Sequence, residues 1–152
     1  SATKARNLFY VYGAIMGLSL ASILFVYTGA SVARAFFITA GAFAGLSLYG
    51  YTTKRSLSAM GSFMIIGLFG LIIASIVNMF MASTQMEFVI SVGGVLIFAG
   101  LTAWDTQRIK SMYMAGDSRE VAAKKSIFGA LTLYLDFINM FLFILRLFGN
   151  RE

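Results

Sequence analysis

Two acidic residues in or beside long apolar segments are the strongest chemical signal in this sequence. Asp136 lies within the apolar run 127–148, which carries no other acid, and Asp105 closes the apolar run before it. An isolated carboxylate at bilayer depth costs at least ~2.5 kcal/mol, so such residues usually face the interior of a helix bundle and mark a path for ions or protons.

If the two carboxyl groups lie together in a dry interior, they resist double ionisation and can hold one shared proton. Loss of that proton leaves two negative charges, which attract a hard cation or force the helices apart. Calcium suits such a site because it accepts carboxylate, amide and water oxygens. We therefore predict a proton-controlled gate in which Asp105 and Asp136 sense pH and also contact calcium.

Other polar residues recur on the same helix faces as the two acids. At about 100° per residue, Thr132 and Asn139 share a face with Asp136, and Thr102 shares a face with Asp105. A helix with one polar stripe is best placed with that stripe inward. We expect these residues, together with Asn78 of the preceding apolar segment, to line or support the path.

The spacing alone leaves other roles open for the acids. Asp136 could only hydrogen-bond Ser, Thr or Asn on a neighbouring helix, and Asp105 could be an interfacial acid beside Arg108. An intramembrane aspartyl protease also needs two aspartates. The glycine-aspartate context of those enzymes is missing here, because Asp105 follows Trp104 and Asp136 follows Leu135, so we expect no enzyme.

The composition restricts the class of protein. Of the 152 residues, 59% are hydrophobic and only 12% are charged, which predicts a polytopic membrane protein forming one helical domain. The absence of cysteine and histidine excludes thiolate and imidazole catalysis, disulfides and metal sites built on those residues, and we expect no cofactor. Membrane topology explains the net charge of +6 better than nucleic-acid binding does.

Five segments have roughly the 20 apolar residues that cross a bilayer. They lie at about residues 8–27, 32–51, 62–81, 88–106 and 127–148. Three of the connections are short, and we expect a long one at 107–126. Within it, Asp117 and Glu120 have the spacing of a capping box, which predicts a short helix leading into the last segment.

The basic residues indicate how the segments are oriented. One side of the five spans carries most of the basic residues, namely Lys4, Arg6 and the bases of 52–60 and 107–126. This side should be cytoplasmic. The N-terminus is then expected in the cytoplasm and the C-terminus on the opposite side.

Small residues at a spacing of four occur in the first two segments, as Gly13 and Gly17 and as Gly41 and Gly45. This spacing permits close approach of helix backbones. We interpret it as general tight packing in preference to a specific dimer face.

Two motifs in the second half of the chain resemble a known family. WDTQRIK, Trp104–Lys110, resembles the aspartate-threonine-glutamine signature of the Bax-inhibitor family, the transmembrane Bax-inhibitor-motif proteins. LTLYLDFINMFLFILRLFG, Leu131–Gly149, is similar to the last membrane helix of that family. TAGAFAGLSLYGYTTKRSLSAMG is similar to its bacterial branch. Trp104 departs from the pattern, since tyrosine is common there.

The resemblance implies a bundle of seven helices around a central last helix, of which this chain supplies the third to seventh. Two N-terminal helices, and with them a basic partner for the aspartates, are then expected to be missing. It also implies a pH-sensitive calcium leak in a bacterial inner membrane, with Asp105 and Asp136 as the sensor. The alternative that it implies is a non-conducting subunit or regulator of a membrane-bound protease or a larger membrane complex.

Overall fold

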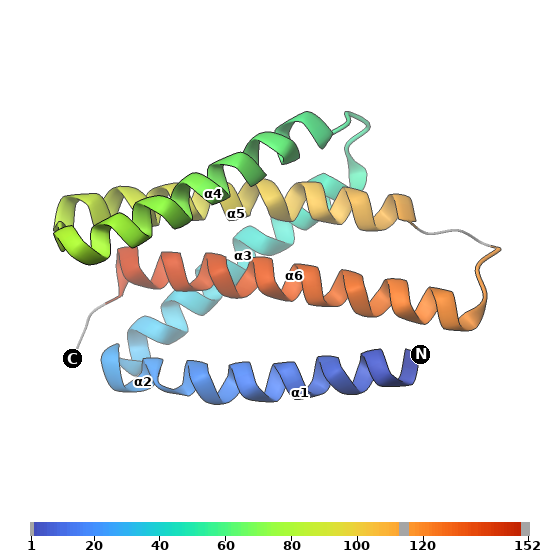
Figure 1. The fold of residues 1–152 in the computed structure, drawn as a ribbon, viewed down its shortest axis with the longest axis horizontal. Helices are drawn as coiled ribbons and strands as arrows, with labels where there is room; N and C mark the ends of the chain where they lie inside the picture. Colours follow the sequence, from blue (N-terminus) through green and yellow to red (C-terminus); the bar gives the residue numbers. More distant parts are fainter. Residues whose placement is uncertain (1, 113–115, 150–152) are drawn as a thin grey trace.

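The computed structural model describes residues 2–112 and 116–149, and every element in these ranges is a helix. This confirms the predicted all-α bundle. Along the chain, the helices are α1 (Ala2–Ala21), the short α2 (Ile23–Val26), α3 (Gly29–Thr52), α4 (Ser58–Met81), α5 (Thr84–Met112) and α6 (Arg119–Phe148). Figure 1 shows α1, α5 and α6 running close to the long axis of the molecule, with α3 and α4 inclined to it.

Four of the helices, α3 to α6, are long and apolar enough to cross a membrane. They correspond to four of the five predicted spans. The fifth, predicted at 8–27, is not among them, because the chain turns at Ser22 and divides this segment between α1 and α2. Helix α1 also begins as early as Ala2, so it includes the charged Lys4 and Arg6.

The long connection predicted at 107–126 is wrong. Helix α5 continues to Met112 and α6 already begins at Arg119. Ser118, and not Asp117, is the N-cap of α6, and its hydroxyl oxygen accepts a hydrogen bond from the Val121 amide at 3.2 Å. Apolar content marks only the part of a helix that lies in lipid, whereas the helical backbone extends beyond it at both ends of this connection.

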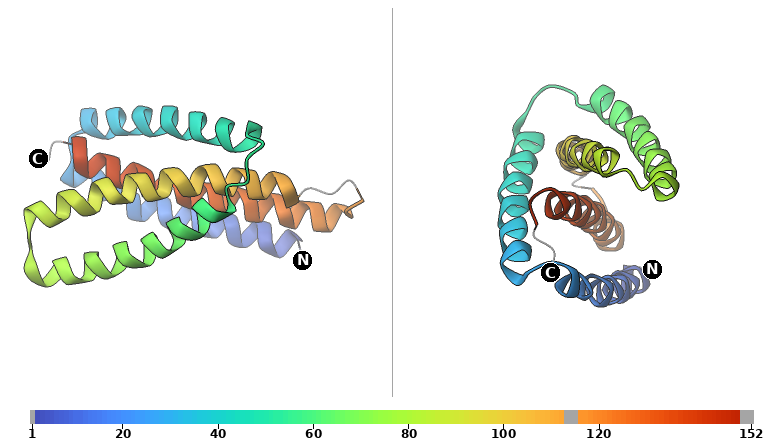
Figure 2. Two further views of the ribbon diagram at one scale, coloured as in Figure 1. Left: turned by 90° about the horizontal axis from the view of Figure 1, so that it is seen from above. Right: turned by 90° about the vertical axis from the view of Figure 1, so that its left-hand side faces the viewer.

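The last helix is the centre of the bundle, as predicted. Helix α6 packs against α1, α3 and α5, and α4 packs against α5. The end-on view in Figure 2 shows α6 flanked by α1, α3 and α5. The fully buried side chains of α6 are Met140 and Leu145, and they pack with Ala35 of α3 and Leu101 of α5.

Glycine allows α3 and α5 to approach closely at one end of the bundle. A Cβ atom on Gly50 would collide with the backbone carbonyl of Ala103. By contrast, nothing lies within 4 Å of the Cβ positions of Gly41 and Gly45, so the tight packing that we predicted there is not found. The close contact is made at Gly50, beyond the segment where the small-residue spacing is most regular.

The charged connections gather at one end of the bundle, on the right in Figure 1. The Ala2 amide donates to the Glu120 carboxylate at 3.3 Å, and the Lys110 ammonium donates to the Tyr51 carbonyl at 2.7 Å. The start of α1, the end of α3, the end of α5 and the start of α6 therefore share one end. That this end faces the cytoplasm stays a prediction.

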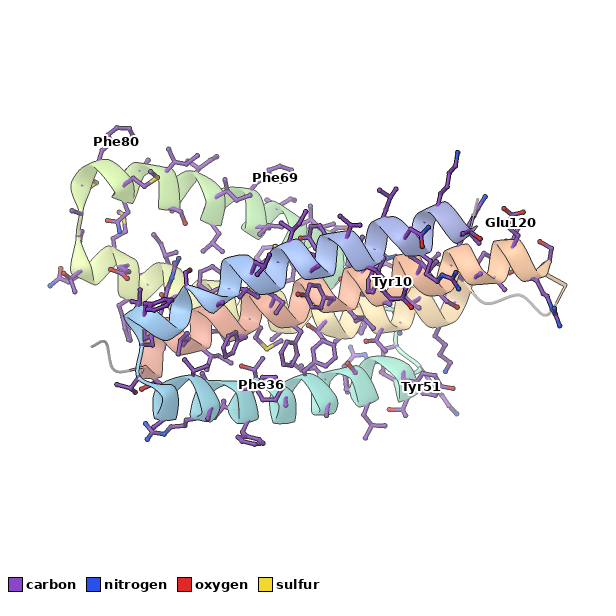
Figure 3. All side chains as sticks on the ribbon, turned by 90° about the horizontal axis from the view of Figure 1, so that it is seen from below. Tyr10, Phe36, Tyr51, Phe69, Phe80 and Glu120 are labelled. Atoms are coloured by element: carbon purple, nitrogen blue, oxygen red, sulfur yellow. The ribbon has the colours of Figure 1, made fainter. Side chains whose placement is uncertain are left out.

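The outer surface is apolar over much of its length. Figure 3 shows Phe69 and Phe80 pointing away from the bundle on α4, and their side chains are 64% and 86% exposed. In water such a surface would be unstable, but in lipid it needs no protein partner. This distribution is that of a membrane-embedded bundle.

Candidate functional site

The structure brings Asp105 and Asp136 together. The two residues lie on the antiparallel helices α5 and α6, are only 4% and 5% exposed, and have their side chains within hydrogen-bonding reach of each other. This neighbourhood was the central prediction from the sequence, and the geometry of the two helices provides it.

Arg108 is the basic partner of this pair. Its Nη2 atom donates to Oδ1 of Asp105 at 2.8 Å, and it also acts electrostatically on Asp136. The guanidinium lies over the Trp104 ring, 4.6 Å from its centroid. That ring packs directly on Gly61 of α4, where a Cβ atom would collide with it. Trp104 is thereby fixed from α4 and orients Arg108 toward the acids.

One carboxylate oxygen of the pair has no donor. Oδ2 of Asp136 is buried and accepts no hydrogen bond from any residue in the described part of the chain when both acids are ionised. Two carboxylates offer only acceptors, whereas one proton turns either of them into a donor. A proton on one of the two carboxyl groups would give this oxygen the hydrogen bond that it otherwise lacks.

A cavity of about 580 Å³ opens beside Asp136, between α4, α5 and α6. Four polar side chains line it: Asp136, Thr132, Asn139 and Ser75. The rest of its lining is apolar, contributed by Leu68, Leu71, Ile72, Ile76, Met79, Phe98, Leu101, Leu135 and Phe143. Two of the predicted path residues, Thr132 and Asn139, thus share one cavity with Asp136.

The other two predicted path residues lie elsewhere. Thr102 is fully buried, and its hydroxyl donates to the Phe98 carbonyl of the same helix at 2.7 Å. Asn78 lies at the far end of α4, where its side-chain oxygen accepts from the Ser83 amide at 2.9 Å and closes the turn to α5. This turn includes Ala82 in the left-handed region, with φ of 50°. Neither Thr102 nor Asn78 borders the cavity, and a supporting role for them stays a prediction.

The acids present do not form a closed metal cage. Within residues 2–112 and 116–149, no three or more His, Cys, Asp or Glu side chains come together to hold a metal ion. Calcium takes six to eight oxygen ligands, and two carboxylates supply only part of such a shell.

Sequence reasoning missed the role of Gln107. Its side-chain oxygen accepts from the Leu57 amide at 2.8 Å, and its side-chain nitrogen donates to the Arg55 carbonyl at 2.7 Å. One side chain of α5 therefore holds the half of the α3–α4 connection that leads into α4. The sequence did offer a signal for this role. Gln107 carries a side-chain amide, which can donate and accept at once, two residues after Asp105, where an apolar helix leaves the membrane.

Replacement of Gln107 by Leu is expected to loosen this connection, because the Leu57 amide loses its partner. The loss should cost about 1–3 kcal/mol of local opening free energy. Hydrogen exchange of the amides at 55–57, followed by mass spectrometry, measures it. Thr106→Val is the matched control, since the Thr106 hydroxyl bonds only the Thr102 carbonyl of its own helix. Equal exchange in both variants would contradict the role of Gln107.

The whole chain, residues 1–152, matches the family described as inhibitor of apoptosis-promoting Bax1. Among curated relatives, protein RP147 of Rickettsia prowazekii is 53% identical over 148 residues, which is 97% of this chain and 63% of that protein. The inner membrane protein YbhL of Escherichia coli K12 is 50% identical over 154 residues, which is 100% of this chain and 66% of that protein. The chain thus spans slightly less than two thirds of the length of these relatives.

The family match agrees with the resemblance seen in the motif around Asp105. The bundle has the central last helix that this resemblance implied. The relative from Escherichia coli carries its cellular location in its name, and α3 to α6 here are of membrane-crossing length and composition. The chain belongs to the Bax-inhibitor family and is a multi-pass membrane protein of its bacterial inner-membrane type.

Proposed function

We propose that the protein is a pH-sensitive calcium leak in which Asp105 and Asp136 share one proton in the closed state. The observation that carries this proposal is the contact between two buried carboxyl groups on different helices. When the shared proton leaves, the pair gains a second negative charge. Repulsion then favours separation of α5 and α6, and the charge attracts a divalent cation.

The cavity beside Asp136 supports a path for the ion. Thr132 and Asn139 place oxygen atoms on the same side of α6 as the carboxylate. Their hydroxyl and amide groups now bond to carbonyls one turn earlier in α6, at 2.9 Å and 2.8 Å. Both can rotate toward a hydrated cation at low cost, because those carbonyls already accept backbone hydrogen bonds within the helix.

The proposal is tested with the full-length protein in liposomes that contain a calcium-sensitive dye. Calcium influx is expected to increase as the pH rises through the loss of the shared proton, because the open state is the doubly charged one. Protein-free liposomes give the background at each pH. Influx that stays at background over the whole range would exclude conduction.

A second candidate function is that of a non-conducting membrane subunit that binds a membrane-bound protease or another membrane complex. The mostly apolar lining of the cavity between α4 and α6 favours it, since apolar walls suit a hydrophobic helix better than a hydrated ion. In that case no catalytic step belongs to this chain. Two results together would favour this function over the leak. The protein would show no flux, and it would form a stable complex that a bulky substitution in that cavity, such as Ser75→Trp, blocks.

A further inference from the structure

A second, polar cavity lies at the charged end of the bundle, separate from the one beside Asp136. It has a volume of about 340 Å³ and is formed by the α3–α4 connection, the start of α4 and the end of α5. Its lining contains two basic residues, Lys54 and Arg108, and no acidic residue. Three hydroxyl groups, of Ser56, Ser58 and Ser111, also border it. A cavity of this composition attracts anions.

Arg108 has donors to spare for a ligand. Its Nη2 atom serves Asp105 and its Nε atom is buried, but the Arg108 side chain as a whole is 38% exposed and lines the cavity. The guanidinium is planar and rigidly oriented by the Trp104 ring, which also lines the cavity. A fixed guanidinium with free N–H groups matches the oxygens of a phosphate group.

The start of α4 adds a second source of positive potential. Leu57 occupies its N-cap position and offers no side-chain hydrogen bond to the first turn. The Ser58 amide donates to Oγ of Ser56 at 3.4 Å, and Ser58 lines the cavity, so the positive end of the α4 dipole lies beside it. Gln107 fixes the approach to this turn by holding the Leu57 amide.

The position of the cavity fits the headgroup level of a bilayer. It lies where α3 ends at Thr52 and α4 begins at Ser58, at the border between the apolar spans and the charged connections. Tryptophan is enriched at this level of membrane proteins, and basic pockets between membrane helices bind the headgroups of anionic lipids. We propose that this cavity binds a phosphate-type anion, such as the phosphodiester group of an anionic phospholipid.

The sequence provides its own probe, because Trp104 is the only tryptophan in the 152 residues and lines the cavity. Short-chain phosphatidylglycerol is added to the full chain in neutral detergent while tryptophan fluorescence is recorded, with phosphatidylcholine as the zwitterionic comparison. A saturable change with phosphatidylglycerol alone is expected, and Trp104→Phe should remove it. Native mass spectrometry counts the bound lipids independently.

Two lysine variants with the same change of charge test whether binding occurs in this cavity. Lys54→Gln should weaken the binding of phosphatidylglycerol by about fivefold or more. Lys124→Gln, at an exposed position of α6 paired with Glu120 at 3.9 Å, should leave it within about twofold. Equal weakening by both variants, or equal affinity for both lipids, would overturn the proposal.

Inorganic phosphate tests whether the bound anion is a free phosphate ion or the phosphate group of a lipid. If phosphate displaces the lipid and changes the fluorescence by itself, the site recognises a free phosphate ion. If phosphate has no effect while phosphatidylglycerol binds, the lipid is the ligand. Because this readout needs no ion flux, it stands or fails independently of the calcium leak.

Discussion

Replacement of Asp136 by Asn is expected to abolish the pH dependence of calcium flux and to reduce the flux at alkaline pH by at least about tenfold. The Asn side chain has nearly the same shape, but it cannot share a proton with Asp105 or gain a second negative charge. At ~4 Å, the attraction between a carboxylate and a cation amounts to several kcal/mol near a protein surface, and a tenfold change requires less than half of that. Calcium flux into dye-loaded liposomes, measured over a pH series, gives both the pH dependence and the flux at alkaline pH.

Asp105→Asn should produce the same loss, because either acid alone leaves the pair with one titrating group. Glu120→Gln is the matched control: it removes one negative charge at the same end of the bundle, from a side chain that is 57% exposed. This variant should retain the pH dependence of the parent. Undiminished, pH-dependent flux in Asp136→Asn and Asp105→Asn would remove the two aspartates from the mechanism.

Much of the fold could be predicted because the bilayer imposes simple rules on sequence. Runs of about 20 apolar residues located α3 to α6, and the resemblance to the Bax-inhibitor family implied that the last helix is central. The first segment was harder to interpret. Its apolar residues continue past Ser22 into α2, and hydrophobicity does not register a break in backbone direction.

The acid pair could be predicted and its surroundings could not. Asp105 and Asp136 are conspicuous because charge is rare in apolar helices, and their positions on consecutive apolar segments allowed them to meet. The surroundings of the pair depend on the rotation of each helix about its axis. They also depend on contacts between residues 50 positions apart in the sequence, such as that between Gln107 and Leu57. Asn78 shows that a polar residue in a membrane helix can also close the turn that ends the helix, which its position in the sequence does not reveal.

Close packing near the acids provides the second large prediction, concerning stability. Gly50→Ala is expected to lower the free energy of unfolding by about 2–3 kcal/mol, as is typical when a methyl group is forced into a filled interface. The added Cβ atom would meet the carbonyl oxygen of Ala103, which is backbone and cannot rotate away. Helices α3 and α5 must then separate. Unfolding by sodium dodecyl sulfate in mixed micelles, followed by circular dichroism, measures the loss.

Gly45→Ala on the same helix is the control, because nothing lies within 4 Å of its Cβ position. There the added methyl group should be neutral or stabilise the helix by up to about 1 kcal/mol, since alanine restricts the unfolded chain and favours the helix. Ala103 precedes Asp105 by only two residues, so the separation caused at Gly50 should also displace the acid pair. Gly50→Ala is therefore expected to alter the pH dependence of flux, whereas Gly45→Ala leaves it intact. Equal stability of the two variants would contradict the close contact between α3 and α5 on which the position of Asp105 depends.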